Sequence, residues 1–330
     1  MSSLGSERDL IEHIRRRLPA APSSLVVAAG DDAAVAVPER GALQVLTTDS
    51  VVEGIHFDRR FSSFADVGYR ALAVNVSDVA AMGGTPTLAL LSFLLPAATT
   101  LAEVDGLLDG ILEMAADAKI AIAGGNLSRS PGPLVVDVTV TGHVRPRRIL
   151  TRSGGKAGDA LYLTGAVGGA AAGLEWLKDG GQSGPAGMED CARRHRRPNP
   201  RLRIGALLGR NRAASACMDL SDGLADAVRQ MTTASGTGAS IDAAAIPVDP
   251  GAALWFASKG RDPVIAACSG GDDYELLFAV PRKAGGRLRT VVRAARGVPI
   301  TRIGELTKEP EVVLQREGRS EPLPAGFSHF

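Results

Sequence analysis

The chain has 330 residues, of which 45% are hydrophobic and 22% charged, so it is long enough for two domains and too apolar to be disordered. A net charge of +1 and an aromatic content of 4% give no general attraction to nucleic acid or to an anionic membrane, and no base-stacking platform. The polar N-terminus predicts no signal peptide, and no apolar run is long enough to predict a membrane span. Three widely separated cysteines without C-x-x-C spacing argue against a disulfide framework or a zinc site, and we expect a reducing, cytoplasmic compartment.

The first elements alternate between helix and strand. Ser6 with Asp9 predicts the start of a helix that Pro19 ends, and we interpret Arg15–Arg17 as its solvated face. Apolar runs predict strands over residues 25–29, 33–37 and 43–48. Residues 51–57 read as a loop, and His56 in it is either a substrate contact or an ordinary loop histidine.

A longer helix follows, and it carries an acidic residue in an apolar context. Ser63, with Asp66 three residues on, resembles a capping box, and Gly83-Gly84 ends the helix. Asp78 lies among Val and Ala residues with no Lys or Arg within one turn. A carboxylate in such a place is costly unless something positive meets it. Two interpretations remain open, a cation ligand and an ordinary surface aspartate.

Further oxygen-rich groups occur at predicted strand ends. Gly30-Asp31-Asp32 follows one apolar run, and Thr47-Thr48-Asp49 ends another. Clusters of carboxylate and hydroxyl oxygens suit Mg²⁺ or Ca²⁺ better than zinc. Mg²⁺ in turn favours phosphates as its other ligands.

The rest of the first half predicts strands over 88–95, 120–123 and 134–143 and a helix over 101–118. A polar, glycine-containing segment then places a domain boundary near Leu150. We therefore expect two domains of α/β (or α+β) class, 1–149 and 150–330. In the second half we expect strands over 160–164, 216–218, 276–280, 300–306 and 312–314, and helices over 170–178 and from about 224 to 234.

Three motifs of the second half bear on function. Gly165–Gly169 lies between a strand and a helix but matches neither the Rossmann nor the P-loop pattern, so a tight turn and a backbone role near a ligand both stay open. The basic run Arg193–Arg197 is typical of a solvated helix end. Asp219-Leu220-Ser221-Asp222-Gly223 places two carboxylates and a hydroxyl at a helix N-terminus, which favours a phosphate and its metal.

Taken together, the motifs resemble one family over nearly the whole chain. They are, in order, Gly30-Asp31-Asp32, Thr48-Asp49 with Gly54-x-His56-Phe57, Asn75-x-Ser77-Asp78-x-Ala80-Ala81-Met82-Gly83, Gly124-Gly125, Thr151-Arg152-Ser153-Gly154, Asp219-Leu220-Ser221-Asp222-Gly223 and Ser269-Gly270-Gly271-x-Asp273-Tyr274-Glu275. Each motif alone is weak, whereas seven in the same order are specific. This set resembles the thiamine-monophosphate kinases, within a superfamily that includes aminoimidazole ribonucleotide synthetase.

The resemblance implies a fold, a reaction and a site. It implies the two-domain aminoimidazole ribonucleotide synthetase-like fold, whose N-terminal mixed sheet pairs across a homodimer and whose two domains hold ATP between them. It implies transfer of the γ-phosphoryl group of ATP to thiamine monophosphate. It implies several Mg²⁺ ions bound by Asp31, Thr47, Thr48, Asp49, Asp78, Asn126, Asp219 and Asp222. It implies ATP contacts from Gly125, Asn126, Arg152 and Ser221, and substrate contacts from His56, Asp272 and Phe327.

The chemistry of these residues fits that reaction. Two phosphates can approach only if their charge is neutralised, and the attacking oxygen is already anionic, so no general base is needed. Two positions depart from the family: Asn126 stands where Asp is usual, which predicts weaker metal binding, and Asp272 stands where Glu is usual. The alternatives are an amidine-forming synthetase of the same superfamily and a non-catalytic nucleotide-binding paralogue.

Overall fold

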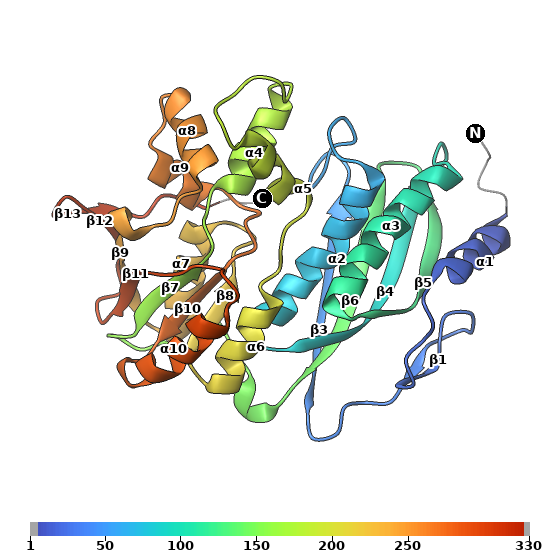
Figure 1. The fold of residues 1–330 in the computed structure, drawn as a ribbon, viewed down its shortest axis with the longest axis horizontal. Helices are drawn as coiled ribbons and strands as arrows, with labels where there is room; N and C mark the ends of the chain where they lie inside the picture. The colour runs from blue at the N-terminus through green and yellow to red at the C-terminus, as the bar shows by residue number, and fades with distance from the viewer. Residues whose placement is uncertain (1–5, 327–330) are drawn as a thin grey trace. The chain divides into compact units, whose positions relative to one another are not determined.

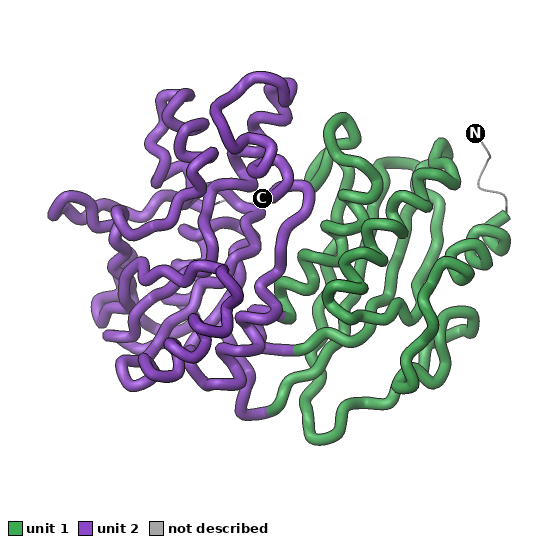
Figure 2. Tube along the Cα trace, in the orientation of Figure 1, with its two compact units in different colours: residues 1–79, 85–145 green, residues 80–84, 146–330 purple. Residues whose placement is uncertain are grey.

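The computed structural model describes residues 6–326 and divides into two compact units (Figure 2). Unit 1 comprises Met1–Val79 and Thr85–Arg145. Unit 2 comprises Ala80–Gly84 and Pro146–Phe330.

Unit 1 is built on a four-stranded mixed sheet in the order β3-β6-β4-β5. The β3/β6 and β6/β4 pairs are antiparallel, and the β4/β5 pair is parallel. A separate two-stranded ribbon pairs β1 with β2. The strands are β1 (Leu25–Val27), β2 (Val35–Ala36), β3 (Leu43–Val52), β4 (Thr85–Pro96), β5 (Ala121–Ser130) and β6 (Val135–Val144).

Helices α2 (Phe64–Ala81) and α3 (Leu101–Ala118) lie across one face of this sheet (Figure 1). They pack closely because glycines face backbone at the crossing: a Cβ atom on Gly110 would lie 1.8 Å from the carbonyl oxygen of Ala65. On the sheet, Val136, Val138 and Val140 of β6 are fully buried, whereas the residues alternating with them are only partly buried. Alternation of side chains along a strand therefore gives the sheet a helix-covered face and an uncovered face.

Helix α1 (Glu7–Arg17) is fixed to α3 by charged contacts. Its capping box joins Ser6 and Asp9, as predicted. The interpretation of Arg15–Arg17 as a solvated face is wrong for Arg17, which donates to Asp105 and Asp109 of α3. Burial raises the pKa of Asp105, but hydrogen bonds from His13 and Arg17 outweigh it and lower the pKa of this carboxyl overall.

Unit 2 contains a seven-stranded sheet in the order β13-β12-β9-β11-β7-β10-β8, with every pair antiparallel except β12/β9. Its strands are β7 (Ala160–Thr164), β8 (Ala216–Asp219), β9 (Gly238–Asp242), β10 (Leu276–Val280), β11 (Ile300–Thr307), β12 (Val312–Arg316) and β13 (Arg319–Pro322). Its helices are α4 (Gly169–Lys178), α5 (Met188–Arg196), α6 (Leu202–Asn211), α7 (Leu224–Ser235), α8 (Pro250–Ser258), α9 (Pro263–Ser269) and α10 (Gly285–Ala294).

A hydrophobic core on one side of this sheet holds Phe278 of β10 against helices α6 and α10, with Ile204, Leu208 and Val291. The last turn of α2 belongs to the same core through Ala81. It fits there because Gly205 of α6 has no side chain: a Cβ atom would lie 1.9 Å from the carbonyl oxygen of Ala80.

Most expected elements are confirmed, and the differences concern where strands end. The capping box of Ser63 with Asp66 is present, and β7 and β10 match their predicted bounds. Several strands are longer than predicted. The largest differences are in β3, which runs on to Val52, in β4, which covers Thr85–Pro96, and in β5, which continues through the glycines to Ser130. Helices α6, α8, α9 and α10 and strands β9 and β13 were not predicted.

Within residues 6–326, no helix combines the length and apolarity that crossing a membrane requires.

Candidate functional site

In unit 1 the structure brings Thr47 of β3 to Asp78 of α2. The hydroxyl of Thr47 donates to the Asp78 carboxylate, with 2.5 Å between the oxygens. One turn earlier on α2, Asn75 is fully buried and its amide donates to the carbonyl of Ala71. The amide oxygen of Asn75 has no hydrogen-bond partner, so an acceptor is left over in this part of the helix.

The predicted group Thr47-Thr48-Asp49 lies in the middle of β3, not at a strand end as predicted. Thr47 faces α2. By alternation Asp49 shares that face, and Thr48 points to the uncovered face, where its hydroxyl lies 3.0 Å from that of Thr139. Side chains of Thr47 and Thr48 therefore cannot bind one ion together.

Asn126 also lies on the uncovered face. It pairs with Ser92 of β4, and the two side chains are in contact at 3.4 Å. Ser92 pairs in turn with Asp137 of β6, which accepts from Ser50 of β3. A polar row thus crosses all four strands on this face, and the sheet separates Asn126 from the Thr47–Asp78 pair within one copy of unit 1.

Gly125, the neighbour of Asn126, is required by packing. A Cβ atom there would lie 1.9 Å from the carbonyl oxygen of Leu91 on the paired strand.

Asp31 and His56 lie in loops of unit 1. Asp31 is exposed and accepts from the backbone N–H of Asp32. His56 accepts the backbone N–H of Val52 at its Nδ1 atom, at 3.1 Å. In the neutral ring the proton must then be on Nε2, so that atom can donate to an anion.

In unit 2 the first acidic motif, Asp219–Gly223, and the second acidic motif, Ser269–Glu275, lie side by side. The antiparallel β8/β10 ladder continues past the strands, because the N–H of Asp272 donates to Ser221 and the N–H of Tyr274 donates to Leu220. Gly271 allows this approach, since a Cβ atom would lie 2.6 Å from the carbonyl oxygen of Ser221. Asp219 is buried and Asp222 is half-buried.

Helix α7 begins directly after these motifs, at Gly223. This N-cap residue has φ +92° and no side chain to cap the helix. The N-terminus of α7 therefore presents backbone N–H groups and the positive end of the helix dipole beside Ser221 and Asp222.

Arg152 is held against the same helix. Its guanidinium donates to Gln230 of α7, and Gln230 donates to Asp226 one turn earlier. At the other end of the chain, Gly326 lies beside Asp226, where a Cβ atom would approach the Asp226 Cβ to 2.6 Å. Phe327 lies outside the described residues.

The N-terminus of α4, by contrast, is already occupied. The carboxylate of Asp273 accepts from the backbone N–H groups of Gly168 and Ala170, at 2.7 and 3.2 Å. Burial raises the pKa of Asp273 to about 7, although these two hydrogen bonds act to lower it. A Cβ atom on Gly165 would lie 2.0 Å from Glu275. These contacts favour the interpretation of Gly165–Gly169 as a tightly packed turn.

The basic run lies at a helix end as predicted, but only Arg193 in it is exposed. It lies in α5 and the segment after it, and Arg194 and His195 make internal contacts with Asp249 and Asp272. Arg201 binds Glu275 through two nitrogens. The carboxylate of Glu275 is fully buried and also accepts from Thr164 at 2.6 Å.

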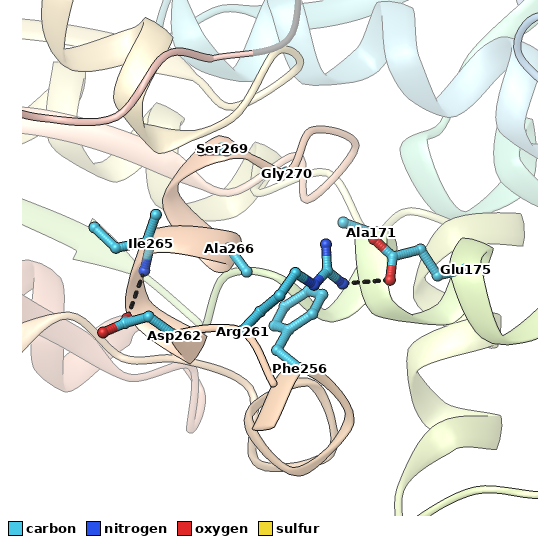
Figure 3. A pocket seen from close by; sticks show the side chains of 9 residues that line it. All are labelled: Ala171, Glu175, Phe256, Arg261, Asp262, Ile265, Ala266, Ser269 and Gly270. Carbon is cyan, nitrogen blue, oxygen red and sulfur yellow. Dashed lines mark hydrogen bonds and ion pairs between the residues drawn. The ribbon is translucent and has the colours of Figure 1, made fainter. Parts of the chain in front are cut away.

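A pocket of about 460 Å³ lies beside the Ser269-Gly270 end of the second acidic motif (Figure 3). Its one lining arginine, Arg261, is ion-paired with Glu175 and stacks on the ring of Phe256 at 4.7 Å. None of the predicted ligands lines it. Because the cation is already paired, we assign no phosphate to this pocket.

The donor set suits a magnesium ion held largely by phosphates. Among residues 6–326, no group of three or more His, Cys, Asp or Glu side chains is arranged to hold a metal ion. Mg²⁺ commonly takes one or two protein carboxylates and completes its shell with water and phosphate oxygens. Asp78 with Thr47, and Asp219 with Asp222, are oxygen donors of that kind.

Several residues of this region were missed by sequence reasoning. Gln230 and Asp226 hold Arg152, and His195 and Arg201 contact the second acidic motif. No sequence motif indicates these roles, because the residue that each of them supports lies far away in the sequence.

Family models place the chain among the AIR synthase related proteins. Residues 30–144 match the model "AIR synthase related protein, N-terminal domain", and residues 156–317 match "AIR synthase related protein, C-terminal domain". The thiamine-monophosphate kinase of Rhodopirellula baltica is 34% identical over 309 residues, covering 91% of this chain and 89% of the relative. The chain belongs to the thiamine-monophosphate kinase family.

Solved structures agree with this assignment. Thiamine-monophosphate kinase from Stenotrophomonas maltophilia K279a superimposes with a TM-score of 0.82 at 30% identity, covering 94% of this chain and 96% of that chain. AaThiL complexed with AMPPCP and TMP superimposes with a TM-score of 0.78 at 30% identity, covering 99% and 97%.

Proposed function

We infer that this chain transfers the γ-phosphoryl group of ATP to the phosphate of thiamine monophosphate, giving thiamine diphosphate and ADP. The observation that carries this inference is the family membership over nine-tenths of the chain, together with the acidic motifs beside the uncapped N-terminus of α7. The AaThiL complex holds AMPPCP and TMP, which supports the same pair of substrates here.

The side chains at the site bind and position groups and abstract no proton. The attacking phosphate oxygen is already anionic, so the barrier lies in bringing two anions into line. Arg152, oriented by Gln230, supplies guanidinium donors for a phosphate oxygen. The N-terminal N–H groups of α7 supply further positive potential.

We propose that Asp31, Thr47, Asp49, Asp78, Asp219 and Asp222 hold Mg²⁺. When bound, Mg²⁺ neutralises the phosphate oxygens and fixes their geometry. Asp31, Asp49 and Asp78 belong to unit 1, and Asp219 and Asp222 to unit 2.

We also propose the remaining contacts. Thr48 and Asn126 were also expected as metal ligands. Both lie on the uncovered face of the sheet, so they could bind only a metal ion located on that face. ATP is contacted by Gly125, Asn126, Arg152 and Ser221. Thiamine monophosphate is contacted by His56, Asp272 and Phe327, and Nε2 of His56 is suited to donate to its phosphate.

A homodimer through unit 1 is proposed as well. The uncovered face exposes Leu46 by 67% and Leu90 by 41%, and large exposed apolar side chains on a sheet face are typical of an interface. A cytoplasmic location is supported by the three cysteines, which are unpaired and buried.

The test is an assay for ADP release with ATP, Mg²⁺ and thiamine monophosphate, with thiamine as a second acceptor and mass spectrometry of the product. We expect thiamine diphosphate from thiamine monophosphate and no product from thiamine. Asp222→Asn should lower kcat/KM about 100-fold, while Asp179→Asn, which alters an exposed ion pair with Lys259, leaves it unchanged. Nucleotide binding without ADP release would favour a non-catalytic paralogue.

A further inference from the structure

Asp272 is the most exposed carboxylate of the motif Ser269–Glu275. Glu275 is fully buried and Asp273 is only 8% exposed, and both make structural contacts. The Asp272 side chain is 28% exposed. Among these three carboxylates, solvent reaches that of Asp272 most.

The main chain at Asp272 is held in an unusual conformation. Asp272 has φ +70° and Tyr274 has φ +49°, values that residues other than glycine rarely adopt. The N–H groups of both residues are tied to the Leu220-Ser221 segment. The backbone of Asp272 is therefore fixed, and the direction of its carboxylate is decided by the residues that contact the side chain.

His195 is the residue behind it. The imidazole is 3% exposed, and its Nδ1 atom lies 3.4 Å from the Asp272 carboxylate. His195 belongs to α5, which packs tightly on α4: a Cβ atom on Gly173 would lie 2.3 Å from the backbone of Cys191. An almost fully buried ring thus contacts the more exposed carboxylate of Asp272.

Further ion pairs fix α5 and the segment after it to the acidic motif. Arg194 lies 3.3 Å from Asp249 and 3.9 Å from Glu275, and Arg201 binds Glu275. Ion pairs therefore hold the chain in place before and after His195. A residue that orients a carboxylate needs its own position to be fixed in this way.

We propose that His195 is a positioning residue that orients the Asp272 carboxylate toward thiamine monophosphate, an inference that depends on the proposed function. An anionic Asp272 is repelled by phosphate. It therefore recognises the thiamine part, which carries a positively charged thiazolium ring and an aminopyrimidine with N–H donors. His195 acts on recognition of the acceptor and leaves ATP binding unchanged.

Two variants of His195 provide a matched pair. The side-chain amide nitrogen of Asn occupies the place of Nδ1, and that of Gln occupies the place of Nε2. Both are polar and smaller than or similar to His. His195→Asn should therefore keep the contact with Asp272. His195→Gln should remove it, although the two variants have side chains of similar polarity.

The experiment measures KM for thiamine monophosphate and KM for ATP by ADP release, with thermal denaturation of each variant. We expect His195→Gln to raise KM for thiamine monophosphate about tenfold, which corresponds to the loss of about 1.4 kcal/mol of binding free energy when the polar contact that orients Asp272 is lost. KM for ATP should change less than twofold, and His195→Asn should stay within threefold of the wild type in both. In the Asp272→Ala background, His195→Gln should have no further effect.

The outcomes separate the two proposals. Wild-type protein that releases no ADP with thiamine monophosphate overturns the proposed function, and the role of His195 with it. Active wild-type protein whose His195→Gln variant keeps its KM for thiamine monophosphate overturns the role of His195 alone. Equal increases in both KM values, or additive effects with Asp272→Ala, assign His195 a structural role and likewise overturn the proposal.

Discussion

Removing one partner of the buried ion pair of Glu275 and Arg201 should strongly destabilise unit 2. Glu275 is fully buried and Arg201 has a 13% exposed side chain, and the carboxylate also accepts from Thr164. Glu275→Gln removes the negative charge and places an NH₂ group, itself a donor, next to the donors of Arg201 and Thr164. Breaking a buried pair on one side costs about 3–5 kcal/mol, because the remaining charge is left without a partner.

For a domain of 150–250 residues, 1 kcal/mol corresponds to about 2–4 °C, so the melting temperature of unit 2 should fall by about 6–20 °C. Both tryptophans of the chain, Trp176 and Trp255, lie in unit 2, so tryptophan fluorescence follows its unfolding. Glu305→Gln is the control: its ion pair with Arg302 is half exposed, and its loss should cost less than about 0.5 kcal/mol. A Glu275→Gln protein that melts within about 2 °C of wild type would refute this reasoning.

Three further predictions concern pH, metal and assembly. The folded state holds a proton on Asp273 up to about pH 7, whereas the unfolded chain releases it near its ordinary pKa of about 4. Protonation of Asp273 therefore stabilises the fold fully below about pH 4, and this contribution is lost as pH rises through about 7. The stability deficit of Asp273→Asn, measured by urea unfolding, should accordingly shrink between about pH 5 and pH 8; a constant deficit contradicts it. Thr47→Val removes the hydroxyl beside Asp78 and should raise the Mg²⁺ concentration for half-maximal activity several-fold, while Asp179→Asn, which alters an exposed ion pair, should leave it unchanged; an unchanged Mg²⁺ requirement for Thr47→Val contradicts the role of Thr47. A markedly lower Mg²⁺ requirement for Asn126→Asp would assign Asn126 to the metal. Leu46→Asp should convert a dimer into monomers in analytical ultracentrifugation, and an unchanged sedimentation coefficient argues against the uncovered face as the interface.

Local elements followed from the sequence wherever neighbouring residues decide the structure. The capping boxes at Ser6 and Ser63 and the turn at Gly83 were predicted correctly, because side chains within one turn satisfy the free backbone groups. The apolar runs of β7 and β10 were also recognised with their bounds. The ordered motifs sufficed to indicate the family, since their residue types and order do not depend on knowing the fold.

Strand length was decided by pairing. Strand β5 continues through Gly124, Gly125 and Asn126 because each pairs with β4, and ladder hydrogen bonds outweigh the low strand propensity of glycine. The same holds for β3, where Thr47–Asp49 pair with β6. The sequence indicated where these oxygens occur, and only the sheet decided which of them share a face.

The sequence by itself determined the family motifs, the helix caps and most strands of this protein. Only the tertiary structure decided that Asp273 caps α4, that Arg201 neutralises Glu275 and that His195 contacts Asp272. Each of these pairs joins residues that are distant in the chain. These polar groups are stable where they lie only because the fold brings a partner to each of them, and no local pattern encodes which partner that is.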